Sequence, residues 1–287
     1  MGTMLLWACA VPSYEAESDA LQACDQPDLR SQIAATSDAF EVPVCLHAVW
    51  PSEEIAGRRF TADLEDSTAK RHIDRVNRVL AGAPNGEGTA RTRDTGIRLV
   101  LDQVLVHGDP ELVLLGRAED HQAGVEALAD AWQVEDCVNV YVLFDDGMSE
   151  SMAWASYPGT PDRGGIVTVN KPGERTLAHE WGHILGLRHT HEQDFGAEWD
   201  GDCDVTGDLL CDTPPDPGPE LCRQWIDSAT EESWVDCPER LNHLESRIPL
   251  DNLMSYWEPP WTSQGFSGEQ IERMHCTWSE GRDQVIP

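Results

Sequence analysis

The stretch that decides the fold is Thr176-Leu-Ala-His-Glu-Trp-Gly-His-Ile-Leu-Gly-Leu-Arg-His-Thr-His191. His179 and His183 are four residues apart, so on an α-helix their imidazoles lie on one face, one turn apart, where both can bind a single zinc ion. On a continued helix His189 would point away from that face. Because glycine can adopt a positive φ, we expect the helix to end at Gly186 and the chain to turn back, bringing His189 to the same ion.

Glu180 lies beside the two helical histidines, where it is placed to act on a zinc-activated water and not to bind the metal itself. The full pattern is H-E-x-x-H-x-x-G-x-x-H, and every fixed position is filled. A surface helix that happens to carry histidines is the alternative. The added glycine and third histidine argue against such a coincidence, so the pattern predicts a hydrolytic zinc site.

Composition limits the classes of partner. A chain of 287 residues can bury a core in one or two domains. Its net charge of −32 repels nucleic acid phosphates and anionic membranes, which argues against both as partners, and it would attract cationic peptides and calcium. A well-solvated acidic surface is the simpler explanation of most of this charge.

Nine cysteines indicate an oxidising compartment, so we expect a secreted or cell-surface protein. No apolar run reaches transmembrane length. Met4-Leu-Leu-Trp-Ala-Cys9 resembles a bacterial lipoprotein cleavage site, although it lacks a preceding basic region and Trp7 is unusual there. Lipidation of Cys9 is therefore a hypothesis; it would leave an even number of cysteines.

Strands and helices are expected to alternate up to residue 190. The expected strands cover residues 41–50, 97–104, 137–144 and 165–170, of which the third is apolar on both faces and therefore central. The expected helices cover 67–80, capped by Ser67, and 118–133, and another begins near Pro172 and Glu174. Residues 147–163 are expected to form a loop. This alternation predicts an α/β sheet backed by helices.

After residue 191 the amino-acid composition changes and little hydrophobic periodicity remains. Residues 192–250 are rich in Asp, Pro, Gly and Cys, which is typical of a segment held by disulfides and not by a large apolar core. A last helix is expected over residues 267–276. His47 lies inside the first expected strand, where a packed histidine is a better expectation than a metal ligand.

Downstream motifs add a family resemblance. Met254, in Asp251-Asn-Leu-Met-Ser-Tyr256, is similar to the Met-turn of metzincins. Together with Gly207-Asp-Leu-Leu-Cys-Asp-Thr-Pro214 and Gly265-Phe-Ser-Gly-Glu-Gln-Ile-Glu-Arg-Met274, it makes the chain resemble the pappalysin family of secreted metzincin endopeptidases, from about residue 42 to residue 276.

The resemblance implies an α/β (α+β) metzincin-like fold. A catalytic domain at residues 41–287 would divide into an upper and a lower subdomain, at 41–186 and 187–287. The upper one would hold a twisted mixed sheet backed by helices that include the zinc-binding helix. The lower one would be irregular and disulfide-rich, with a C-terminal helix. Residues 1–40 would be an N-terminal segment: a signal or lipoprotein remnant, or a short pro-segment.

The resemblance also implies roles for individual residues. His179, His183 and His189 would bind zinc, Glu180 would be the general base and Gly186 the hinge, and Met254 would be the Met-turn residue. Tyr256 would bind zinc in the resting enzyme or hydrogen-bond the tetrahedral intermediate. Asp208 and Thr213 match a calcium-liganding element, with Asp212 nearby, and oxygen ligands from an acidic loop suit calcium. A merely solvated acidic loop is the alternative.

Departures from the family pattern leave the cysteines open. His191 stands where the family has an aromatic residue, and Cys211 where it has a small one. The resemblance favours a Cys203–Cys237 disulfide. The partners of Cys211, Cys222 and Cys276 stay open, and Cys24 is expected to pair with Cys45 or Cys137, or else to cap the zinc as a thiolate in a latent form.

The predicted function is a secreted or surface-anchored, monomeric zinc endopeptidase that hydrolyses peptide bonds of proteins. By resemblance, the expected edge strand at 165–170 would bind extended substrate by strand addition. A catalytically inactive metalloprotease-like binding module is one alternative. An aminopeptidase is another, although such enzymes usually take their third ligand from a downstream carboxylate.

Overall fold

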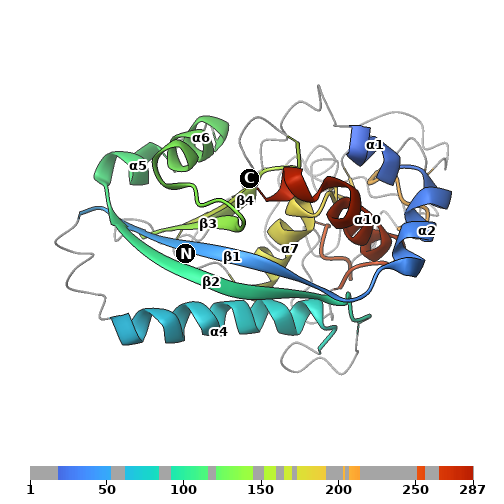
Figure 1. The fold of residues 1–287 in the computed structure, drawn as a ribbon, viewed down its shortest axis with the longest axis horizontal. Helices are drawn as coiled ribbons and strands as arrows, with labels where there is room; N and C mark the ends of the chain where they lie inside the picture. Colours follow the sequence, from blue (N-terminus) through green and yellow to red (C-terminus); the bar gives the residue numbers. More distant parts are fainter. Residues whose placement is uncertain are drawn as a thin grey trace, which may run out of the picture.

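Five strands form one sheet in a computed structural model of the chain (Figure 1). The structure describes residues 19–52, 62–83, 92–115, 121–144, 152–159, 165–169, 173–191, 203, 207–213, 251–255 and 265–286. The strands are β1 (Phe40–Trp50), β2 (Ile97–Gly108), β3 (Val138–Leu143), β4 (Met152–Ala155) and β5 (Gly165–Val169). Their order in the sheet is β2-β1-β3-β5-β4, and every neighbouring pair is parallel except β4 and β5.

Helices cover both faces of this sheet, which explains why its central strands are apolar on both sides. α4 (Ala62–Leu80) and α7 (Glu174–Ile184) pack on one face, where Val42, Val44 and Val140 meet Ile73 and Trp181. α5 (Pro110–Leu115) and α6 (His121–Trp132) lie on the opposite face. The core on that face consists of Val49, Val113, Val125, Leu128, Tyr141, Leu143, Trp154 and Val167. The predicted α/β class is confirmed.

Some elements differ from the sequence-based expectation. The predicted edge position of β5 is wrong, because β4 pairs with it antiparallel and lies at the end of the sheet. The predicted cap at Ser67 is also wrong, since α4 begins five residues earlier, at Ala62, and contains Ser67. The expected helix over 118–133 is present as α6, and the separate short helix α5 precedes it.

A layer of helices built from both ends of the chain lies beside the sheet (Figure 1). α1 (Asp19–Cys24) and α2 (Pro27–Thr36) pack against α10 (Gly268–Val285), which is longer than the expected helix at 267–276. Ser267 caps α10: its Oγ accepts from the Gln270 N–H at 3.1 Å, and Gln270 Oε1 accepts from the Ser267 N–H at 2.9 Å. No helix of the described residues is both long and apolar enough to span a bilayer.

Three disulfides lie within the described residues: Cys24–Cys276, Cys45–Cys137 and Cys203–Cys211. The expected Cys203–Cys237 bond is therefore wrong. Cys203 and Cys211 are only eight residues apart, and the positive φ of Gly207 (64°) turns the chain between them. Both expectations for Cys24, a bond to Cys45 or Cys137 and a zinc-capping thiolate, are also wrong, because Cys24 is bonded to Cys276. Cys9, Cys222 and Cys237 lie outside the described residues.

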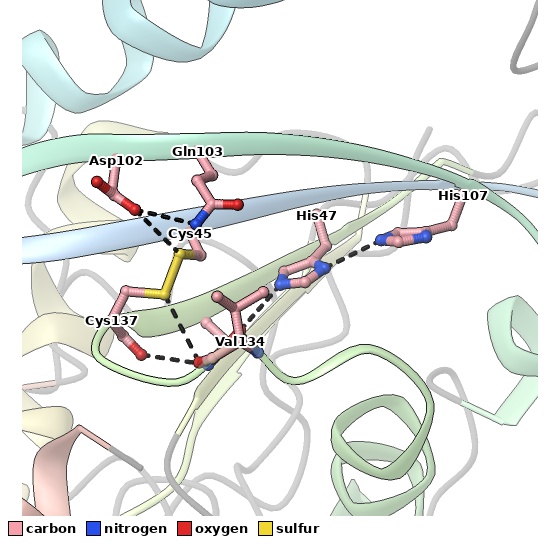
Figure 2. The surroundings of a disulfide bond; sticks show 8 residues. Cys45, His47, Asp102, Gln103, His107, Val134 and Cys137 are labelled. Atoms are coloured by element: carbon pink, nitrogen blue, oxygen red, sulfur yellow. Dashed lines mark hydrogen bonds between the residues drawn. A yellow bond between two sulfur atoms is a disulfide. The ribbon is translucent and has the colours of Figure 1, made fainter.

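Figure 2 shows the polar cluster next to the Cys45–Cys137 bond. His47 Nδ1 lies 3.0 Å from His107 Nε2, which joins β1 to the end of β2. His47 Nε2 lies 2.9 Å from Asn139 Oδ1 on β3. His47 is fully buried, and it is a packed residue that takes no part in the histidine group described below.

Candidate metal centre

The helix α7 presents the first two candidate ligands and ends so that the third can reach them. Glu174 lies in its first turn, where a carboxylate interacts favourably with the helix dipole. Gly186 has a φ of +82°. Its N–H donates to the His183 carbonyl and the Leu187 N–H donates to the Gly182 carbonyl, each at 2.9 Å. This is the hydrogen-bond pattern of a Schellman motif, which reverses the chain direction just before His189.

The three histidine side chains converge. The Nε2 atoms of His179, His183 and His189 lie 3.1 Å from one another in every pair. All three residues are buried, with 8%, 3% and 3% of their surface exposed. They form a group that can hold one metal ion. Among the described residues, no other cluster of His, Cys, Asp or Glu side chains meets this condition.

Backbone carbonyls fix the tautomers of two of these rings. Nδ1 of His179 donates to the Leu253 carbonyl at 2.6 Å, and Nδ1 of His183 donates to the Leu187 carbonyl at 2.8 Å. A carbonyl oxygen can only accept, so Nδ1 carries the proton in both rings and Nε2 keeps its lone pair. Such outer partners orient metal-binding histidines and set the tautomer.

The spacing of the nitrogens fits a zinc-sized ion. The centre of a 3.1 Å triangle lies roughly 1.8 Å from each corner, which is shorter than the usual Zn–N distance of about 2.0–2.1 Å. The difference is only roughly 0.2–0.3 Å, so the three Nε2 atoms would together hold one zinc-sized ion.

Burial keeps these histidines neutral, which is the form that binds metal. It lowers the pKa of His179 to about 4, and it lowers the pKa of His183 and His189 well below their ordinary value. For the latter two, repulsion by the neighbouring histidines acts in the same direction. The triad is thus prepared for a cation and opposes its own protonation.

Glu180 is buried within the same helix, with 2% of its surface exposed. Its Oε2 has no hydrogen-bond partner among the described residues. Burial raises the pKa of this carboxyl to about 8, whereas a dication at the triad would favour the ionised form. A buried carboxyl with a free oxygen next to a metal-binding triad can accept and return a proton.

Met254 packs directly against the backbone of α7. A Cβ added at Gly182 would lie 2.5 Å from Met254 Sδ, so only glycine leaves the space that the methionine fills. The Thr190 N–H donates to the Met254 carbonyl at 3.1 Å, and the Met254 N–H donates to Asn252 Oδ1 at 2.8 Å. The turn at residues 251–255 is therefore fixed between α7 and the segment that carries His189.

The acidic element at residues 207–213 uses its oxygens within the protein. Asp208 Oδ1 accepts from Thr213 Oγ1 at 2.5 Å, and its Oδ2 accepts from Gln270 Nε2 at 2.9 Å. Burial raises the pKa of Asp208 to about 6, although these hydrogen bonds oppose the rise. Asp212 accepts from Ser267 Oγ at 2.7 Å and from the Glu269 N–H at 2.8 Å, so it holds the start of α10.

Two aromatic contacts at the triad were given no role from the sequence. The ring of His191 stacks on that of His189, with centroids 4.9 Å apart and planes 21° apart. The ring of Tyr157 lies 5.0 Å from that of His183. Spacing rules could not find Tyr157, because the strand β5 lies between it and α7 in the sequence. Tyr256 lies outside the described residues.

A mixed α/β sheet, a buried triad on H-E-x-x-H-x-x-G-x-x-H and a methionine turn packed against the helix together define the metzincin class of metallopeptidases. Residues 122–278, more than half of the chain, match the family model Peptidase_M43, described as pregnancy-associated plasma protein-A. The chain therefore belongs to this family, the pappalysins, and the predicted family is confirmed.

Individual relatives agree with this assignment. The chain is 30% identical over 111 residues to extracellular metalloproteases of Arthroderma benhamiae and Trichophyton verrucosum. The match covers 38% of this chain and 31% of each relative, so it spans about a third of their length. The solved structure of mirolysin in complex with compound 9 matches 87% of this chain and 97% of its own, with a TM-score of 0.50 and 17% identity. This likeness supports the fold.

Proposed function

We propose that the protein is a zinc-dependent endopeptidase that hydrolyses peptide bonds of proteins outside the cell. The observation that carries the proposal is the set of three buried Nε2 atoms 3.1 Å apart, with the buried Glu180 carboxyl next to one of them in the same helix. Family membership and the names of the two fungal relatives support it. The disulfides favour an oxidising, extracellular location.

His179, His183 and His189 would hold the zinc. Bound there, zinc would supply a Lewis acid and lower the pKa of a coordinated water to about 7. Glu180 would accept a proton from the attacking water and deliver it to the leaving amine. Tyr256 would bind the zinc in the resting state or hydrogen-bond the oxyanion that develops on the peptide carbonyl.

The substrate would bind in extended form at the end of the sheet. Because β4 covers β5, the free edge at this end of the sheet belongs, among the described strands, to β4. We therefore propose Met152–Ala155, in place of residues 165–170, as the strand that pairs with the peptide.

An inactive binding module is the less favoured alternative. A protein that had lost catalysis would be free to lose a ligand, the base or the tight glycine, and all of these are present. Action as a monomer and lipidation at Cys9 stay predictions.

Glu180→Ala tests the mechanism. The variant should bind one zinc per chain as the parent does, and should hydrolyse a denatured protein at least about 10²-fold more slowly, since general-base catalysis is removed. Glu174→Ala is the matched control, because Glu174 is a carboxylate in the first turn of the same helix, five residues before His179. Mass spectrometry of the products distinguishes internal cleavage from removal of terminal residues. Full activity of Glu180→Ala would refute the mechanism.

Calcium at Asp208, Asp212 and Thr213 stays a prediction. Oxygen donors support it, but each carboxylate already accepts protein hydrogen bonds that the ion would have to replace. Repeating the same assay with and without added calcium, at saturating zinc, tests it. An increase of activity on adding calcium that is seen in the parent and is lost in Asp208→Asn would support the site.

A further inference from the structure

We propose that Asp25 and Arg273 are positioning residues for the metal centre. The N-terminal helices α1 and α2, which hold Asp25 in place, therefore support metal binding. Both residues lie far in sequence from the triad. The inference rests on the proposed function only in that the triad binds zinc. It concerns how the turn between the second and third ligands is held in place.

Arg273 anchors that turn directly. Only 1% of its surface is exposed, and its Nε donates to the Gly186 carbonyl at 2.7 Å. Gly186 follows the C-cap residue Leu185, so its carbonyl lies outside the hydrogen bonds of the helix, and a charged donor satisfies such a group well. Because Gly186 is the residue at which the chain turns towards His189, the guanidinium of Arg273 fixes the path of the third ligand.

Asp25 connects the two sides of the turn. One of its carboxylate oxygens accepts from Arg273 Nη1. The other lies 3.9 Å from Nη2 of Arg188, the residue immediately before His189. Arg188 and Arg273 are both buried, with 4% and 1% of their surface exposed. A buried cation is costly without a counter-charge, and the Asp25 carboxylate supplies one to both guanidinium groups.

The N-terminal segment is built to hold Asp25 at this place. Cys24, its neighbour, is bonded to Cys276, which is one helical turn after Arg273 on α10. Further along, Arg30 Nη2 lies 2.7 Å from Glu269 Oε2, and Ser31 Oγ donates to Glu272 Oε2 at 2.8 Å. Figure 1 shows α1 and α2 beside α10. The disulfide and these contacts fix the Asp25 carboxylate from both directions.

This arrangement couples the N-terminal segment to metal binding. Without the Asp25 charge, the turn from Gly186 to Arg188 would lose the group that joins its two sides. His189 would then have more freedom, and the free energy of zinc binding would have to restrict it. Removal of the N-terminal segment should therefore weaken zinc binding, whereas removal of an inhibitory segment would activate the site.

Zinc affinity of the full-length apo-protein, measured by competition with a chromogenic chelator, tests this. Asp25→Asn keeps the shape and removes the charge. Arg273→Lys keeps the charge and loses the Nε–H directed at Gly186. Each should weaken zinc affinity about tenfold, the lower end of the effect of outer-shell changes. The double variant should lose less free energy of zinc binding than the two single variants lose together, because the two residues act as one unit.

Two control variants separate positioning from mere stability. Arg98→Ala breaks an exposed ion pair with Asp94 that does not lead to Gly186. Val125→Ala removes buried volume from the opposite face of the sheet and should lower the melting temperature. Both should bind zinc within about twofold of the parent, as expected for changes that touch no outer-shell partner.

Parent-like zinc affinity in folded Asp25→Asn or in folded Arg273→Lys would overturn the inference. So would an equal loss of affinity in Val125→Ala, because that would trace the effect to stability alone. The parent's own zinc binding reports separately on the proposed function, since it does not depend on either variant.

Discussion

Gly182 is the residue at which a single methyl group is expected to disturb the centre. In an open helix, alanine in place of glycine would add about 1 kcal/mol of stability. Here the new Cβ would lie 2.5 Å from Met254 Sδ and 3.3 Å from Phe266 Cε1. Overpacking of this kind costs about 1–3 kcal/mol, so the clash should outweigh the gain in helix propensity.

We expect Gly182→Ala to lower the free energy of unfolding by about 1–2 kcal/mol and to weaken zinc binding, as measured by urea denaturation and chelator competition. Gly173→Ala is the control, because nothing lies within 4 Å of the Cβ it would add. Equal stability of the two variants would contradict this, because it would show that Met254 can shift to accommodate the added methyl group at little cost.

At the residue scale, the sequence indicates the three histidines but few of the residues that hold them in place. The stride of an α-helix and the freedom of one glycine suffice to propose His179, His183 and His189 as a group. The carbonyl of Leu253, the ring of Tyr157 and the guanidinium of Arg273 reach the same place from distant segments. No spacing rule relates them to the motif, since tertiary packing alone brings them there.

Among the elements, the three neighbouring strands β2, β1 and β3 share a buried histidine. The Asn139 Nδ2 donates to the carbonyls of Val134 and Cys137, at 2.9 Å and 3.2 Å, so its Oδ1 faces His47. His47 Nε2 therefore donates to Asn139 Oδ1. Burial favours the neutral His47 ring, in which Nδ1 accepts from His107 Nε2 (Figure 2).

Stability should therefore depend on pH through His47. Burial, with repulsion from His107 as a smaller cause, lowers its pKa from 6.5 to about 4. Above pH 6.5 the ring is neutral in both states. As pH falls from 6.5 towards 4, the unfolded chain binds the proton first, so folding is progressively disfavoured, by roughly 3 kcal/mol at most.

Urea unfolding of the parent and of His47→Gln, at several pH values between 7.5 and 4, tests this. The parent should lose more stability over that range than the variant does, because the other titrating groups are common to both. Parallel pH profiles would show that His47 does not carry the effect.

Prediction of elements failed where pairing decides the structure. Met152–Ala155 is too short to show alternation, and its pairing with β5 alone makes it a strand. Long apolar runs such as residues 41–50 and 137–144 could be identified as strands because burial on both faces leaves a clear signal.

For the whole molecule, the Cys24–Cys276 bond is the principal long-range constraint. It joins residues 252 positions apart, and a cross-link that closes so long a loop restricts the unfolded chain strongly. Cys203–Cys211 closes a loop of eight residues and restricts it much less.

Replacing Cys24 and Cys276 by alanine should lower the free energy of unfolding by about 2–5 kcal/mol. Replacing Cys203 and Cys211 should cost less. Calorimetry of both double variants under non-reducing conditions measures the difference, and a larger loss for the short loop would contradict the chain-entropy explanation.

The class and the family could be predicted at this scale, whereas the disulfide pairing could not. Which cysteines meet depends on how the two ends of the chain pack, and a motif-based resemblance favoured Cys203 with Cys237. The subdomain limits at residues 40 and 186 stay predictions.

The bond between Cys24 and Cys276 makes almost the entire chain a covalent ring. A single cut anywhere between these two cysteines opens the ring without separating the pieces, since both remain attached to one sulfur bridge. The two pieces of a chain nicked in this way would stay covalently joined and could not diffuse apart.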